Sequence, residues 1–307
     1  IIKVDGNTAI VGYKKARTEL SGAISVKWQP IDRLGMSITL REEMFGTEFS
    51  PIIPAFFIDG ILWPRITLPA KASVSINFRF PSLNDLYFQP GGNPNLKKES
   101  GWTYDAGLAF KVGREELYDL SGGITWFDSY VNDWIIWLPT TKGFFSPKNI
   151  KDVHAYGVEL NANTTFYWAK NWSLSLNGTF SWTPSINNGE PMSPADQSVG
   201  KQLPYVPLYS ATVNGKITYK TFSFMYKWCY YSERYTMSSN DLTLTGKLPT
   251  YFMSNITIEK LLKFSWSDIS LKFNINNLFN EEYMSVLSRP MPGINFQLFI
   301  GITPHFY

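Results

Sequence analysis

The sequence has 307 residues, a formal net charge of +3, 44% hydrophobic and 16% aromatic residues, and one cysteine, Cys229. No segment approaches the about 18–20 consecutive apolar residues of a transmembrane helix. The charge is too small to indicate a nucleic-acid partner, and a single cysteine excludes an intrachain disulfide framework and a multi-cysteine metal site. A membrane β-barrel is compatible with this composition, because lipid-facing and lumen-facing residues alternate along each strand and average out.

Alternation of apolar and polar residues predicts β-strands along the whole chain. In segment 172–182, for example, one face carries Trp, Leu and Phe, while the other carries Ser, Asn and Thr. A polar face with so few charges is typical of a hydrated lumen behind a lipid-facing band, rather than of a soluble sandwich. Thirteen strands are predicted, at 14–29, 34–45, 53–63, 69–80, 101–112, 117–133, 152–167, 171–184, 207–219, 221–233, 250–261, 265–277 and 292–302.

Short and long connections alternate between these strands. The short ones are 30–33, 112–115, 169–171, 220–221 and 262–264, and the long ones are 46–52, 81–100, 133–151, 184–206, 233–250 and 278–292. Bacterial outer-membrane barrels have this pattern, with the long loops outside the cell. The sequence therefore predicts an all-β fold, a transmembrane antiparallel β-barrel.

The odd number of strands carries a further expectation. Single-chain bacterial barrels have an even number of strands, and an open sheet edge cannot face lipid. We therefore expect residues 1–307 to be the C-terminal part of a longer barrel, with the remaining strands as its partners. Residues 1–13 would be the remnant of a surface loop.

Aromatic residues gather near the predicted strand ends, where they are expected to form the two interfacial girdles of a membrane barrel. They are Trp102, Tyr167, Trp168, Trp172, Trp182 and Tyr219.

Three segments contain motifs that resemble those of the TonB-dependent receptor family. The first is FRFPSLNDLY at 78–87, the second is GNPNLKKES at 92–100, and the third is NNLFNEEY at 276–283, continued by RPMPGINF at 289–296. Phe80, Lys98 and Ile294 depart from the family pattern. Asn and Pro suit turn geometry, so we expect Asn93, Pro94, Asn95 and Asn277 to fix turns and loop starts. The other motif residues are also expected to be mainly structural: Arg79, Pro81, Leu86, Tyr87, Leu278, Phe279, Tyr283, Pro292 and Gly293.

The resemblance implies a 22-stranded barrel filled by an N-terminal plug that this chain does not contain. It implies active transport of a scarce, bulky nutrient across the outer membrane, with TonB, the plug, the nutrient and membrane lipids as partners. A surface lipoprotein partner is left open. The sequence shows no nucleophile elbow, phosphate loop or His-bearing metal motif, so we expect neither an enzyme nor a cofactor.

Cobalamin is the leading cargo, because the first two motifs look most like those of the vitamin B12 receptor branch. Its polar amide edge would require donors and aromatic walls, and the long loops supply the candidates Trp134, Trp137, Phe144, Phe145, Gln202, Tyr205, Arg234 and Tyr235. The alternative interpretation is that these side chains pack the loops together. Haem is disfavoured, because the only histidines are His154 and His305 and neither lies between the two motifs.

Other functions stay open at this stage. A haem or ferric-siderophore receptor is the second choice within transport. A passive porin, an adhesive surface barrel and a soluble all-β binding module are alternatives of other classes.

Overall fold

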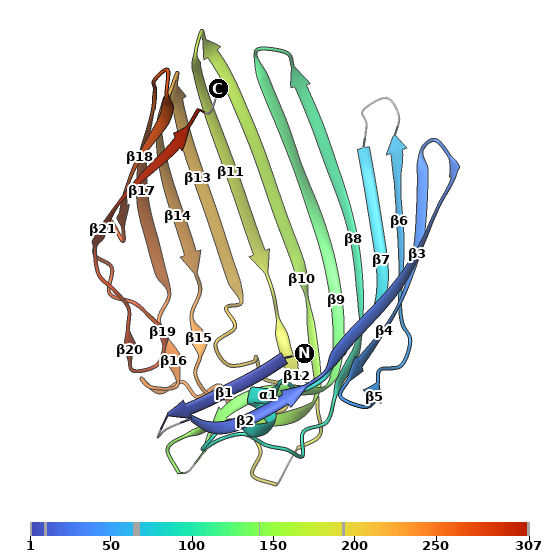
Figure 1. The fold of residues 1–307 in the computed structure, drawn as a ribbon. Helices are drawn as coiled ribbons and strands as arrows, with labels where there is room; N and C mark the ends of the chain where they lie inside the picture. Colours follow the sequence, from blue (N-terminus) through green and yellow to red (C-terminus); the bar gives the residue numbers. More distant parts are fainter. Residues whose placement is uncertain (1, 9–10, 64–67, 141, 192–193, 306–307) are drawn as a thin grey trace.

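The computed structural model describes residues 2–8, 11–63, 68–140, 142–191 and 194–305. Thirteen long strands form one curved antiparallel sheet in which each strand pairs with the next along the chain (Figure 1). They are β3 (Glu19–Ile31), β4 (Leu34–Phe45), β6 (Ile53–Trp63), β7 (Leu68–Arg79), β8 (Glu99–Arg114), β9 (Tyr118–Pro139), β10 (Phe145–Ala169), β11 (Trp172–Trp182), β13 (Tyr209–Tyr219), β14 (Phe222–Tyr231), β17 (Tyr251–Lys263), β18 (Ser267–Asn276) and β21 (Asn295–Pro304). The thirteen predicted strands are confirmed.

The two faces of the sheet differ in composition, as the alternation predicted. Exposed apolar side chains on one face include Leu108, Ile124 and Leu160, which lie opposite one another on β8, β9 and β10. The other face carries ladders of hydrogen-bonded polar groups. Asn77 donates to Thr103 at 2.6 Å, and Thr103 lies 2.9 Å from Ser129. The outward face is therefore suited to lipid and the inward face to water.

Short turns and long loops lie at opposite ends of the sheet, which confirms the predicted alternation (Figure 1). The loop end carries the small elements α1 (Leu83–Tyr87), β5 (Glu48–Phe49), β12 (Ser185–Asn187), β15 (Arg234–Tyr235), β16 (Lys247–Leu248), β19 (Met284–Val286) and β20 (Arg289–Pro290). No described helix is long and apolar enough to cross a membrane.

Two predicted boundaries at the loop end were wrong. The strand predicted at 14–29 begins only at Glu19, because β2 (Val11–Arg17) pairs instead with β1 (Ile2–Thr8) in a hairpin that lies across the loop end (Figure 1). The predicted loop 133–151 is largely strand, because β9 and β10 keep pairing as far as Pro139 and Phe145. In both places backbone hydrogen bonding continued through residues whose alternation is weak.

Trp102, Trp172, Trp182 and Tyr219 are in outward register, each near an end of its strand, as the girdle prediction requires. Tyr167 falls at the register shift between Phe166 and Ala169, so its outward placement stays a prediction. At the turn end, Trp168 stacks on Trp172 with ring centres 5.9 Å apart, and Trp172 stacks on Tyr219 at 4.5 Å. Trp182 lies ten residues along β11 from Trp172. At about 3.3 Å per residue this is about 33 Å along the strand, and a tilt of about 40° reduces it to a height of about 25 Å, the height of an outer-membrane apolar band.

The sheet is open at both ends. Among the described residues, β3 pairs only with β4, and β21 pairs only with β18. Both edge strands are exposed along almost their whole length, with Ile24 at 72% and Leu298 at 66%. Each edge therefore presents unpaired backbone groups beside a row of apolar side chains.

Candidate functional site

The first family motif folds into a short helix at the loop end, and its sequence explains where the helix starts. Ser82 is the N-cap of α1: its hydroxyl accepts from the Asp85 backbone N–H, and the Asp85 carboxylate accepts from the Ser82 backbone N–H at 2.9 Å. This reciprocal capping box satisfies amides at the start of a helix too short to be stable alone.

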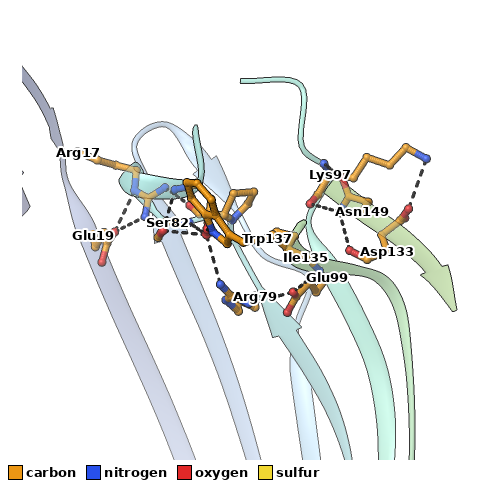
Figure 2. Close-up of polar contacts among 12 residues, drawn as sticks. Arg17, Glu19, Arg79, Ser82, Lys97, Glu99, Asp133, Ile135, Trp137 and Asn149 are labelled. Carbon is orange, nitrogen blue, oxygen red and sulfur yellow. Dashed lines mark hydrogen bonds and ion pairs between the residues drawn. The ribbon is translucent and has the colours of Figure 1, made fainter. Parts of the chain in front are cut away.

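Asp85 is the centre of a buried polar cluster, and its partners Arg79, Ser82 and Trp137 are labelled in Figure 2. Asp85 is 4% exposed, and its carboxylate also accepts from the Ser82 hydroxyl at 2.7 Å and from Trp137 Nε1 at 2.9 Å, while Arg79 Nη2 lies 3.3 Å away. Burial alone would raise the pKa of Asp85, but the hydrogen bonds from Ser82 and Trp137 and the charge of Arg79 hold it below its ordinary value. The ionised carboxylate therefore joins α1 to the end of β9.

Arg79 and Glu99 extend this cluster into the sheet. Arg79 Nη1 donates to Glu99 Oε1 at 2.9 Å, and the same carboxylate accepts from the backbone N–H of Ile135 at 2.7 Å. Beside them, the Asn149 side chain bonds both the N–H and the carbonyl of Lys97, at 2.9 and 3.1 Å (Figure 2). The loop that follows β7 is thus joined to the β9–β10 hairpin at several points.

The N-terminal hairpin packs against the same helix. The Tyr13 hydroxyl donates to the Asn84 side chain, and the Lys15 ammonium lies 5.0 Å from the centre of the Tyr87 ring. Arg17 Nη1 donates to the carbonyl of Pro81 at 2.7 Å. These contacts place β2 over the first motif at the loop end.

A second cluster surrounds Arg234, which is 5% exposed. Its guanidinium lies 4.8 Å from the centre of the Tyr251 ring and donates from Nη2 to the carbonyl of Pro249 at 3.0 Å. Tyr251 in turn packs between Tyr231 and Tyr283, with ring centres 5.2 and 4.8 Å away. The guanidinium therefore joins the loop after β14 to the start of β17.

Gln202 joins two other loops. Its side-chain oxygen accepts from the backbone N–H of Ser185 at 2.9 Å. Its backbone exchanges two hydrogen bonds with the Asn240 side chain, both at 2.8 Å. Close by, the backbone N–H of Tyr205 donates to the carbonyl of Tyr235 at 2.7 Å.

The structure therefore divides the eight loop candidates into two groups in space. Trp134, Trp137, Phe144 and Phe145 lie on the extended β9–β10 hairpin, whereas Gln202, Tyr205, Arg234 and Tyr235 lie where the loops after β11 and β14 meet. The side chains of Trp137, Gln202 and Arg234 form hydrogen bonds to other parts of the protein, which agrees with the loop-packing interpretation for these three. Phe145 is 45% exposed.

The third motif forms a tight turn after β18. Asn277 is 3% exposed and has a φ of 52°. Its side chain accepts from the Glu281 N–H at 2.7 Å and donates to the Glu281 carbonyl at 2.9 Å. A Cβ on Gly293 would lie 2.5 Å from the Asn280 side-chain oxygen, so the chain approaches closely there. Phe279, in contrast, is 71% exposed.

Neither histidine faces the loop surface. His154 is in outward register opposite Tyr130, stacks on that ring at 4.1 Å and lies 2.9 Å from the Asp128 carboxylate. His305 is at the turn end, where Nε2 lies 3.5 Å from Asp268.

Charged side chains line a lumenal cavity that sequence reasoning did not single out. It has a volume of about 480 Å³ and lies towards the turn end of β3–β10, with Lys27, Asp59, Lys71 and Asn161 in its wall. The two buried carboxylates of the loop end, Asp85 and Glu99, were also missed. The S-x-x-D spacing of Ser82 and Asp85 was a signal for a capping box.

Comparison with known proteins identifies the family. The family model described as "TonB dependent receptor-like, beta-barrel" matches residues 3–278. Part of the chain is 34% identical over 99 residues to the vitamin B12 transporter BtuB of Photobacterium profundum, a match that covers 31% of this chain and 16% of that protein. A similar match to BtuB of Vibrio vulnificus is 34% identical over 92 residues and covers 30% of this chain and 14% of that protein.

Solved structures share the fold. The copper transporter OprC superposes with a TM-score of 0.70 at 14% identity, over 94% of this chain and 48% of that one. A mutant of the ferric enterobactin receptor PfeA from Pseudomonas aeruginosa, in complex with enterobactin, gives 0.66 at 16% identity, over 94% and 46%. The chain thus spans less than half the length of these receptors. Since the family model covers most of the chain and the fold agrees, the chain belongs to the TonB-dependent receptor β-barrel family of the outer membrane.

Proposed function

We propose that this chain is the C-terminal barrel portion of a TonB-dependent transporter whose cargo is cobalamin. The observation that carries the cargo is the 34% identity to a vitamin B12 transporter over 99 residues. The solved copper and ferric enterobactin receptors are only 14% and 16% identical, so they support the fold alone.

The polar lining of the sheet supports a large, largely neutral cargo. Hydroxyl and amide groups dominate the inward face, and they form cross-strand pairs such as Asn177 with Asn163 at 2.9 Å and Asn276 with Asn295 at 2.9 Å. Such groups can donate to and accept from the amide edge of a cobalamin. An axial imidazole for haem would have to come from elsewhere, since His154 faces outward and His305 lies at the turn end.

The open edges support a larger barrel. In lipid, unpaired backbone groups cost several kcal/mol each, so an open sheet edge does not persist there. We therefore propose that further strands pair with β3 and β21, and that the complete barrel has 22 strands and is filled by a plug. TonB, the nutrient and the surrounding lipids are the proposed partners.

Family membership favours transport over the alternatives. Membership of an outer-membrane barrel family is incompatible with a soluble all-β binding module. A passive porin or an adhesive barrel would need no energy coupling, so uptake that persists without TonB would identify one of them. A ferric-siderophore receptor is the second candidate, supported by fold alone.

Equilibrium binding to the complete receptor in detergent tests the proposal. Cyanocobalamin, haem and a ferric siderophore are compared in parallel, and we expect tight binding of cyanocobalamin alone. Phe145→Ser probes a loop aromatic with an exposed side chain, and Phe279→Ser, in the loop after β18, is its matched control. Absence of cobalamin binding together with uptake of an iron complex would retire the cargo assignment and leave the family.

A further inference from the structure

A hollow of about 1020 Å³ lies at the turn end of the sheet, between the β8–β9 and β10–β11 turns. The two turns are held side by side, because the Tyr167 N–H donates to the Leu117 carbonyl at 2.9 Å. The wall of the hollow combines three cations, three carboxylates and two aromatic rings. These are Lys111, Arg114, Lys170, Glu115, Glu116, Asp119, Tyr167 and Trp168.

The charged side chains around this hollow form no ion pairs with other described residues. These six charged side chains are all exposed. Six unpaired charges, three of each sign, therefore surround one space. The pattern favours a ligand that itself carries both signs.

The hollow lies at the level of the membrane surface. Trp168 is 54% exposed and begins the outward aromatic stack that continues through Trp172 to Tyr219. Interfacial aromatics of this kind lie at the headgroup level of a bilayer. The short turns face the periplasm, so the adjacent leaflet is the periplasmic one, which consists of phospholipid.

We propose that this hollow binds the headgroup of a phosphoethanolamine phospholipid from the periplasmic leaflet. Arg114 and Lys170 hold the phosphate diester, Glu115 and Glu116 hold the ammonium group, and Tyr167 and Trp168 pack against the glycerol and the first acyl carbons. Arginine and lysine are the usual phosphate ligands in proteins. The site does not depend on which cargo the receptor carries.

Lipid titration of the complete, delipidated receptor tests this assignment. Short-chain phosphatidylethanolamine and phosphatidylglycerol are added to the receptor in detergent, and bound lipid is counted by native mass spectrometry. Arg114→Gln with Lys170→Gln should weaken binding of both lipids about 25-fold, at about fivefold per cation near an anionic headgroup. Glu115→Gln with Glu116→Gln should weaken only phosphatidylethanolamine, which alone carries the ammonium.

The matched control removes two lysines from the same sheet but from its inward face. Lys216→Gln with Lys227→Gln lowers the charge by the same amount on β13 and β14, and lipid binding should stay at the wild-type level. Equal weakening by this control and by the Arg114 and Lys170 pair would overturn the proposal, because only net charge would then matter. Wild-type preference for neither lipid, or unchanged binding in both hollow variants, would overturn it as well.

Discussion

Replacing Trp137 by Phe removes one hydrogen bond from the buried Asp85 cluster and leaves most of the packing in place. The indole Nε1 donates to Asp85 Oδ1 at 2.9 Å, and Asp85 is 4% exposed. A hydrogen bond to a charged group contributes about 1.5–3 kcal/mol. We therefore expect local opening of α1 to become about 10-fold to 150-fold more frequent in Trp137→Phe, since about 1.4 kcal/mol corresponds to a factor of ten.

Hydrogen exchange in the complete receptor measures this opening. The reporters are the N–H groups of Phe88 and Asn93, which donate to the Asn84 and Asp85 carbonyls at 3.0 and 2.8 Å. Local opening limits exchange of such amides, so protection should fall by the same factor. Asp85→Asn should have a larger effect than Trp137→Phe, because it removes the charge that accepts the hydrogen bonds of both Ser82 and Trp137.

The control stays on the same hairpin. Trp134 has no side-chain hydrogen bond among the described residues, so Trp134→Phe should leave the protection of α1 near the wild-type level. Exchange at Phe88 and Asn93 that is no faster in Trp137→Phe than in Trp134→Phe would refute the role of the Asp85 hydrogen bond.

Individual contacts lead to three more predictions. Because the pKa of Asp85 is lowered in the folded state, its ionised carboxylate stabilises α1 fully above the ordinary pKa of 3.8, and this stabilisation is lost on acidification below that value. The hydrogen-exchange protection of α1 should therefore be constant from about pH 5 to pH 8 and fall only in stronger acid. Asn277→Ala should destabilise the loop after β18 by about 2–4 kcal/mol, since it removes two hydrogen bonds to Glu281 and places Ala at positive φ. Gel-shift melting of the complete receptor measures this loss of stability, with the exposed Phe279→Ser as the control. Equal melting temperatures for the two variants would contradict the prediction. Expressed alone in detergent, the chain should associate through its open β3 and β21 edges, and a stable monomer by light scattering would argue against this.

Much of the barrel follows from the sequence alone. A period of two assigns each strand residue to a face, so segment 172–182 already shows which side chains meet lipid and which meet water. The alternation of short and long connections then orients the strands, and it correctly separated the turn end from the loop end. These features are local, because they depend on residues within one strand or turn.

The candidate site at the loop end is different, since it depends on contacts between distant parts of the chain. Trp137 and Asp85 are 52 residues apart, and Tyr13 and Asn84 are 71 residues apart. No local pattern indicated that Trp137 and Arg234 would be held by protein partners, or that 133–151 would continue as strand. The resemblance to family motifs marked the segments that fold into α1 and into the turn at Asn277, but without assigning them the contacts they make.

The sequence by itself determined the strands, their faces and the end of the barrel at which each connection lies. Only the tertiary structure decided which loop side chains pack together, where the N-terminal hairpin lies and which charges remain unpaired at the turn end. The physical reason is that strand alternation is repeated in every strand and tolerates local error. A loop contact depends on a single pair of side chains, whose meeting is set by the curvature of the whole sheet.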